Sequence, residues 1–312
     1  MLPAQLAKGL RLPVMAAPMF LVSGPELVAA SCEQGVIGTF PALNQRTTQG
    51  FAAWLLELQQ RLAGMPQAAA YGVNLIVHKT NPRLEADLEV CVQQRVPLIV
   101  TSLGAVSELV ARVHSYGGLV LHDVTTVRHA QKAVAAGVDG LILVCAGAGG
   151  HAGLLNPFAF VAAVRKFFQG TLVLAGCIGN GRDIAAVKAL GVDLAYMGTR
   201  FIATRESMAS DAYKRMLLRA ETNDVIYTPA VSGVPGNFLR QSLLSAGYDE
   251  ADWHKPASTD VGAELAHAGK SEAKAWRDLW SAGQGVSAID DVPTVAELIA
   301  RLRNEYAEAR AG

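Results

Sequence analysis

The stretch "TLVLAGCIGNGRDIAAVKALGVDLAYMGTRFI", residues 171–202, contains the repeating unit that decides the fold. An apolar run at 171–177 is followed by helical periodicity in "GRDIAAVKALG" and by a second apolar run at 194–202. Short apolar runs bounded by glycine are typical of strands buried on both faces, and strands joined through a helix run parallel. This stretch therefore predicts one strand–helix–strand unit of a parallel sheet.

The same unit recurs through the first two thirds of the chain. Amphipathic stretches separate its apolar runs, and several of them end at a glycine, as helix C-termini often do. Eight such units over about two hundred residues are the number at which a parallel sheet closes into a (β/α)8 TIM barrel. An open doubly wound sheet is the alternative, but no G-x-G-x-x-G follows the first strand. The predicted strands are residues 13–19, 37–42, 71–77, 97–103, 119–124, 140–146, 171–177 and 194–202.

The alternation of predicted strands and helices ends after Thr204. From about Met208 to Lys274 the chain has helix-like stretches, the loop "TPAVSGVPGNFLRQS" and the polar run "GYDEADWHKPASTD", without a strand pattern. We expect a smaller, mostly helical cap inserted over one end of the barrel, followed by a last barrel helix in "VPTVAELIARLRNEYAEARA". The barrel is expected to comprise residues 1–207 and 285–312, and the cap residues 208–284.

Charge and cysteine content restrict the class of partner. The 312 residues include 27 Lys and Arg and 27 Asp and Glu, so no field of one sign is available to attract nucleic acid or an anionic membrane. A small-molecule partner is expected instead. The apolar stretch 12–21 is interrupted by prolines and resembles neither a membrane span nor a signal peptide. The cysteines lack the close pairing of a zinc site and predict reduced thiols in a cytoplasmic protein: Cys32, Cys91, Cys145 and Cys177.

In such a barrel the active site lies at the carboxyl ends of the strands. The loops that follow the last two strands, "AGCIGNGRD" and "MGTRF", contain the glycines with which backbone N–H groups hold a phosphate. The alternative is that they are ordinary tight turns. The other strand-end candidates are Ala17, Pro18, Met19, Asn74, Thr101, Ser102, His122, Asp123 and residues 147–151.

His151 stands in a glycine-rich loop, "VCAGAGGHAGLLNP", residues 144–157. The glycines leave space for a ligand beside the backbone, and the end of the sixth strand directs the histidine to the barrel mouth. His151 is therefore a candidate general base, with an unperturbed pKa near neutrality. A histidine with only a local hydrogen bond is the alternative.

Other chemistry has less support in the sequence. In "HDVTTVRH", His122 and Asp123 are adjacent in a strand and point to opposite faces, so we expect no metal site there. The chain contains no G-x-S-x-G elbow, P-loop or H-E-x-x-H motif. Trp276 and Trp280 either pack within the cap or cover a flat cofactor.

Four motifs resemble those of the FMN-dependent nitronate monooxygenases, formerly called 2-nitropropane dioxygenases: "YGVNL", "AGAGGHAG", "AGCIGNGRD" and "LGVDLAYMGTRFIATRES". FMN-dependent enoyl-acyl-carrier-protein reductases and certain NADH:quinone reductases share them. The resemblance implies a TIM barrel that binds FMN and oxidises nitronates or nitroalkanes with dioxygen. It also implies that His151 is catalytic and that Gly150 lies against the flavin. By the same resemblance, Ala17, Pro18, Met19 and Asn74 contact the isoalloxazine ring, and Ala175, Gly176, Cys177, Gly198 and Thr199 hold the phosphate.

The chain departs from the family pattern at two positions. Cys177 replaces the second of two paired glycines, which a backbone contact tolerates. Asp123 stands where several relatives carry a lysine that approaches the flavin, so a positive charge is lost there. An FMN-dependent NAD(P)H reductase of enoyl thioesters or quinones stays open as an alternative, as does a flavin-free barrel that binds a phosphorylated metabolite. Apolar cap helices would permit a homodimer.

Overall fold

Eight parallel strands close into a barrel in this computed structural model, which describes residues 2–255 and 278–311. Each strand pairs with the next, and the last pairs back to the first, for example Met15 with Tyr196. The fold class predicted from the sequence is therefore confirmed. The barrel strands are β1 (Val14–Ala16), β2 (Ile37–Pro41), β3 (Tyr71–Ile76), β4 (Leu98–Ser102), β5 (Leu119–Val124), β6 (Gly140–Val144), β8 (Thr171–Ala175) and β9 (Leu194–Met197).

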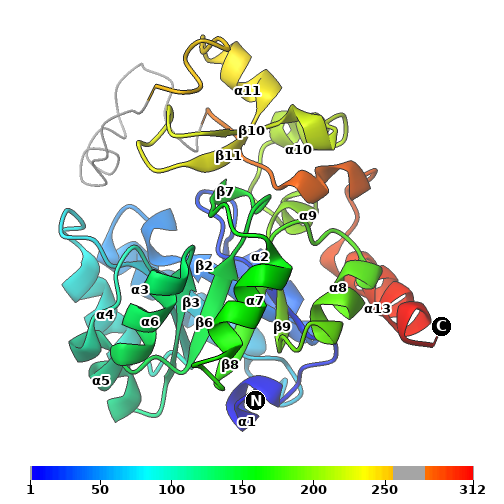
Figure 1. The fold of residues 1–312 in the computed structure, drawn as a ribbon. Helices are drawn as coiled ribbons and strands as arrows, with labels where there is room; N and C mark the ends of the chain where they lie inside the picture. Colours follow the sequence, from blue (N-terminus) through cyan, green and yellow to red (C-terminus); the bar gives the residue numbers. More distant parts are fainter. Residues whose placement is uncertain (1, 256–277, 312) are drawn as a thin grey trace.

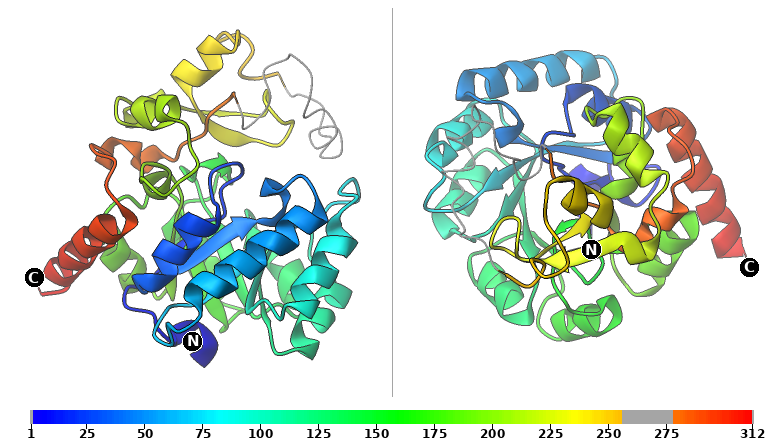
Figure 2. Two further views of the ribbon diagram at one scale, coloured as in Figure 1. Left: turned by 180° about the vertical axis from the view of Figure 1, so that it is seen from behind. Right: turned by 90° about the horizontal axis from the view of Figure 1, so that it is seen from above.

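Helices surround the barrel on its outer side (Figures 1 and 2). The C-terminal helix α13 (Val295–Ala311) packs against α8 and α2 and so covers the strands at the closure of the barrel, as predicted. The short helix α1 (Ala4–Ala7) lies at the end opposite the cap, where Leu6 joins the apolar cluster inside the barrel. The remaining outer helices are α2 (Pro25–Glu33), α3 (Thr48–Leu62), α4 (Leu84–Gln93), α5 (Ser107–Ser115), α6 (Val127–Ala135), α7 (Pro157–Arg165) and α8 (Gly181–Ala189).

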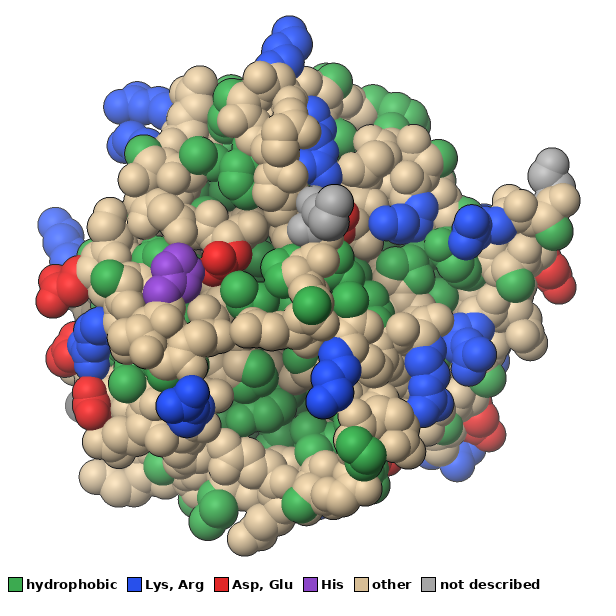
Figure 3. All heavy atoms as spheres, turned by 90° about the horizontal axis from the view of Figure 1, so that it is seen from below, with side chains coloured by type: hydrophobic (Ala, Val, Ile, Leu, Met, Phe, Trp, Pro, Cys, Tyr) green, Lys and Arg blue, Asp and Glu red, His purple; other side chains and the backbone are tan. Residues whose placement is uncertain are grey.

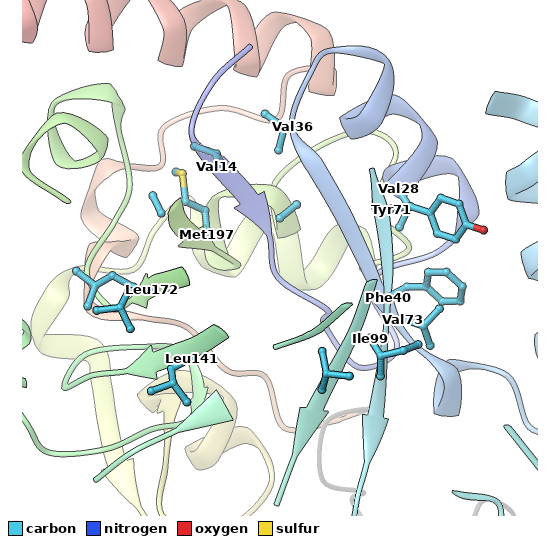
Figure 4. Close-up of a cluster of buried hydrophobic side chains, with 14 of the residues drawn as sticks. Val14, Val28, Val36, Phe40, Tyr71, Val73, Ile99, Leu141, Leu172 and Met197 are labelled. Atoms are coloured by element: carbon cyan, nitrogen blue, oxygen red, sulfur yellow. The ribbon is translucent and has the colours of Figure 1, made fainter. Parts of the chain in front are cut away.

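The core has two apolar layers because successive strand residues point to opposite faces. In β6, Leu141 and Leu143 belong to the layer between strands and helices, and Ile142 and Val144 belong to the layer inside the barrel. Figure 4 shows part of the outer layer, including Phe40. Both faces of each strand are therefore buried, which explains why the strands read as continuous apolar runs rather than as alternating ones.

The N-terminus of α8 is fixed by a capping box. The Asn180 side chain accepts a hydrogen bond from the backbone N–H of Asp183, and the Asp183 carboxylate accepts from the N–H of Asn180 and of Gly179. These bonds satisfy donors that a helix start otherwise leaves unpaired. They also hold the glycine turn after β8 at the barrel mouth.

The segment inserted after the barrel contains strands that the sequence analysis did not expect. β10 (Val225–Thr228) and β11 (Gly236–Leu239) form an antiparallel pair, and β7 (Gly150–His151) adds a third strand through the pairing of His151 with Gly236. The expectation of no strand in this part was wrong, because four-residue strands show little periodicity. Helices α10 (Asp211–Leu217) and α11 (Arg240–Ser245) also belong to this segment, which lies across the ring of strands (Figures 1 and 2).

The last barrel strand is shorter than predicted. β9 ends at Met197, and the predicted strand residues 199–202 form the helical turn α9 (Thr199–Ile202). Gly198 has φ −106° and ψ −69°, so the backbone leaves the strand conformation there. The remaining short turns are η1 (Ala42–Asn44), η2 (Thr222–Asp224) and η3 (Gln284–Ala288). Trp276 lies outside the described residues. The boundaries drawn between barrel and cap stay a prediction.

Charges of both signs are interspersed on the face at the barrel end opposite the cap (Figure 3). This distribution agrees with the zero net charge of the sequence. Within residues 2–255 and 278–311, we find no helix with both the length and the apolar character that crossing a membrane requires.

Candidate active site

A cavity of about 1060 Å³ lies at the carboxyl ends of the barrel strands, between the barrel and the inserted segment. Its size is at the upper end of the range usual for small-molecule and cofactor sites. Thr101 is buried and does not line the cavity. Every residue to which the family resemblance gave a role does line it: Ala17, Pro18, Met19, Asn74, Gly150, His151, Ala175, Gly176, Cys177, Gly198 and Thr199. The structure thus brings these residues together, and their individual roles stay predictions.

The turn after β8 has an unusual backbone. Gly176 has φ +129° and Cys177 has φ +59°, a conformation that a residue other than glycine rarely adopts. Among the described residues, no acceptor receives the backbone N–H of Cys177 or of Thr199. Two N–H groups at the cavity wall are therefore available to an anion, whereas those of Gly179 and Asn180 are already used by Asp183.

The segment 282–285 closes this turn from the other side, which the sequence analysis did not foresee. The N–H of Gly283 donates to Thr199 Oγ1 at 2.9 Å, and the N–H of Gln284 donates to the carbonyl of Gly147 at 2.9 Å. A Cβ at Gly149 would lie 2.8 Å from the nitrogen of Gly283, so only glycine permits this approach. The glycines of "AGQG" were the available signal in the sequence.

Trp280 packs within the inserted segment. Its ring stacks on that of Tyr213 with centroids 5.0 Å apart, and Tyr213 in turn lines the cavity. Of the two readings of this tryptophan, the structure supports packing.

His151 lies in β7, where pairing with β11 holds it above the barrel mouth. Its Nε2 is 2.9 Å from Ser232 Oγ, and Ser232 belongs to the loop between β10 and β11. Burial lowers the pKa of His151 to about 4, so the ring is neutral near pH 7. A neutral imidazole at this place has the protonation state that a general base requires. Ser232 was missed because the histidine lies 81 positions away in sequence.

The floor of the cavity carries a chain of polar side chains from three neighbouring strands. Asn74 Nδ2 donates to Ser102 Oγ at 2.8 Å, and Ser102 Oγ donates to Asp123 Oδ2 at 2.6 Å. Burial raises the pKa of Asp123 to about 6, and the Ser102 hydrogen bond opposes this shift. Tyr196, from β9, also lines the cavity and was not foreseen as a site residue.

His122 shares this rim of the barrel but has a different environment from Asp123. Its Nδ1 lies 2.7 Å from Thr101 Oγ1, and burial lowers its pKa to about 4, with a smaller contribution from His129. Within the described part of the chain, no group of three histidine, cysteine or acidic side chains is arranged to hold a metal ion.

These features are those of a (β/α)8-barrel enzyme with a large cavity for a small molecule. They are the closed barrel, the cavity at its strand ends and the neutral histidine above that cavity. Comparison with known families then gives the particular group. The nitronate monooxygenase family model matches residues 5–305. The chain belongs to this family of flavin-dependent oxidoreductases.

Individual relatives agree with this assignment. A nitronate monooxygenase of Paraburkholderia phytofirmans is 26% identical over 96% of this chain and 94% of its own. The solved structure of nitroalkane oxidase from Streptomyces ansochromogenes superposes with a TM-score of 0.82, at 28% identity, over 99% of both chains. A point variant of FabK from Thermotoga maritima gives a TM-score of 0.78 at 25% identity, over 98% of this chain and 95% of its own.

The residues present fit a flavin nucleotide. Gly147, Gly149 and Gly176 line the cavity. Cys177 and Thr199 line it too, and their backbone N–H groups have no acceptor among the described residues. Asp123 Oδ1 and the Tyr196 hydroxyl are buried and have no hydrogen-bond partner among the described residues. A flat ligand with polar ring atoms and an anionic tail matches both ends of this cavity.

Proposed function

We propose that this protein binds FMN in the barrel-mouth cavity and oxidises nitronates and nitroalkanes with dioxygen. The observation that carries the proposal is the position of His151, half-buried and neutral above the glycine-rich wall of the cavity. Family membership supports the reaction class, and the names of a nitronate monooxygenase and a nitroalkane oxidase among the relatives support the substrate class.

Different residues of the cavity would bind different parts of the FMN molecule. The backbone N–H groups of Cys177 and Thr199 would hold the phosphate. Gly176 and Gly283 allow the close packing of backbone beside them, on the carbonyls of Ala146 and Gly147. Ala17, Pro18, Met19 and Asn74 lie against the ring, and Gly150 leaves room for it. Ala175 and Gly198 keep the ends of β8 and β9 free of bulk at the phosphate.

His151 is the proposed acceptor of the substrate's α-proton. For a neutral nitroalkane, its imidazole removes the α-proton and leaves the nitronate anion. A nitronate added as such needs no deprotonation, so the histidine then only positions it. FMN, when bound, would supply the redox chemistry, and the residues of the chain would bind and orient the substrate. Burial of the ring keeps His151 unprotonated at neutral pH and ready for the first step.

The proposed partners are a small-molecule substrate and dioxygen, without nucleic acid or membrane. A cytoplasmic location and a homodimer are part of the same proposal.

The test is the visible spectrum of the purified protein, recorded without oxygen before and after addition of NADH or NADPH and then of a nitronate. Flavin bands that resist both nicotinamides and bleach with the nitronate support the proposal. Rapid bleaching by a nicotinamide would instead favour a reductase of enoyl thioesters or quinones, for which a cavity of about 1060 Å³ has room. A colourless protein that takes up no FMN would favour a flavin-free barrel.

A further inference from the structure

The polar chain on the cavity floor has a fixed direction. Asn74 Nδ2 has only hydrogens to give, so Ser102 Oγ accepts there and must use its single proton toward Asp123 Oδ2. The second hydrogen of this amide is directed at the carbonyl of Val100, 3.2 Å away. One oxygen of the Asp123 carboxyl thus accepts a hydrogen bond from within the barrel wall.

The other oxygen of Asp123 and the hydroxyl of Tyr196 are both buried without a hydrogen-bond partner among the described residues. They are close enough for Asp123 to raise the pKa of Tyr196, although burial is the larger cause. A buried polar atom without a partner costs free energy, and a buried unpaired charge costs much more. Asp123 and Tyr196 are both among the residues that line the cavity, so a ligand bound there lies next to them.

We propose that Asp123 and Tyr196 form a hydrogen-bond-donating pair, with Asp123 as a neutral carboxylic acid, that binds acceptor atoms of the flavin ring. The inference rests on the proposed function only in taking FMN as the ligand. Ring carbonyl oxygens and unprotonated ring nitrogens are the acceptors that such a pair recognises. In this arrangement Asp123 Oδ2 accepts from Ser102 while the carboxyl proton points to the ligand.

The surroundings of Asp123 favour its neutral form. Its pKa is raised to about 6 by burial, and binding of an acceptor to the acidic proton would raise it further. On β4 its contact is the hydroxyl of Ser102, and β6 (Gly140–Val144) carries no titratable side chain. His122 precedes it on β5, Tyr196 approaches from β9, and α6 contributes Arg128, His129 and Lys132. No cation contributes to the shift of its pKa.

The experiment compares FMN binding by the apoprotein and by its Asp123→Asn and Tyr196→Phe variants, followed by quenching of FMN fluorescence from pH 5 to pH 8. An amide keeps the donor and the acceptor of a neutral acid but does not ionise. The dissociation constant of the native protein is divided by that of Asp123→Asn at each pH. The titration of the FMN phosphate affects both constants equally and so cancels in this ratio. This ratio should rise up to about tenfold per pH unit above pH 6.

A ratio that stays constant from pH 5 to pH 8 would overturn the assignment of Asp123, as would an Asp123→Asn variant that binds FMN more than tenfold worse at pH 5. Tyr196→Phe should bind several times more weakly at every pH and leave the pH slope unchanged. Unchanged affinity would remove Tyr196 from the pair. Native protein that fails to bind FMN at all would contradict the proposed function instead, and circular dichroism confirms that each variant is folded.

Discussion

His151 Nε2 and Ser232 Oγ lie 2.9 Å apart and join the barrel to the inserted segment at the cavity. The Ser232 hydroxyl is also 3.2 Å from the carbonyl of Val234, and a hydroxyl has a single proton. When that proton goes to Val234, Nε2 of His151 must be the donor and the lone pair is on Nδ1. The direction of the Ser232 hydroxyl and the tautomer of the proposed base are therefore linked through this contact.

Replacing Ser232 by alanine removes this contact. Ser232→Ala should keep bound flavin and lose roughly twofold to tenfold in kcat/KM for a neutral nitroalkane, the cost of one hydrogen bond to an orienting partner. Turnover of the nitronate should change little. Nitrogen NMR of labelled histidine should show a changed tautomer balance at His151. Ser245→Ala, an exposed serine on α11, is the control, and an equal loss in both variants would refute the role of Ser232.

Removal of the proposed base should affect the turnover of the nitroalkane and of the nitronate differently. His151→Asn should retain flavin but lose roughly a hundredfold or more in turnover of a neutral nitroalkane, because proton removal is then unassisted. The nitronate should still be oxidised, because it arrives deprotonated. Steady-state oxygen consumption with each substrate measures both rates. Equal losses on the two substrates would exclude His151 as the base.

The proposed phosphate site can be tested by substitutions of Gly198. A Cβ there would meet Ala17 Cβ and Met19 Sδ at 3.6 Å, which is ordinary contact, and its φ is −106°. Gly198→Ala should therefore fold and keep its flavin. Gly198→Asp should give a folded but colourless protein, because a carboxylate would face the phosphate. The ratio of flavin to protein absorbance measures the outcome, and a full complement of flavin in Gly198→Asp would place the phosphate elsewhere.

Acid stability depends on His122. Its pKa is about 4 in the folded protein against 6.5 for the free side chain, so the unfolded chain binds a proton first as the pH falls. The stability that comes from the neutral ring is present above pH 6.5 and is lost between about pH 6.5 and 4. His122→Asn should reduce this loss by up to about 3 kcal/mol.

Urea unfolding of the native protein and His122→Asn at pH 7 and pH 4.5 measures the difference. His254→Asn, at an exposed position, is the control. Asp123 contributes with the opposite sign, because its raised pKa favours the folded state at low pH and this contribution fades toward pH 6. The comparison of variants isolates His122, and parallel pH curves for native protein and His122→Asn would contradict the prediction.

Much of the site could be predicted because it follows the strand ends. Once "TLVLA" is a barrel strand, Gly176 and Cys177 must stand at the mouth, and Asn74 and Gly198 follow from the same register. Ser232, Tyr196 and Gly283 were missed for two reasons. Tyr196 looked like one more strand residue, and the other two meet the site only through contacts between distant parts of the chain.

The sequence by itself determined the barrel, because a strand buried on both faces and an amphipathic helix are each encoded within about ten neighbouring residues. It also determined which residues stand at the ends of the barrel strands, and that His151 follows the sixth of these strands. Only the tertiary structure decided the sheet of β7, β10 and β11, the contact of His151 with Ser232 and the chain from Asn74 to Asp123. A two-residue strand or a single hydroxyl has no local pattern, because its hydrogen bonds exist only after the chain has closed around the cavity.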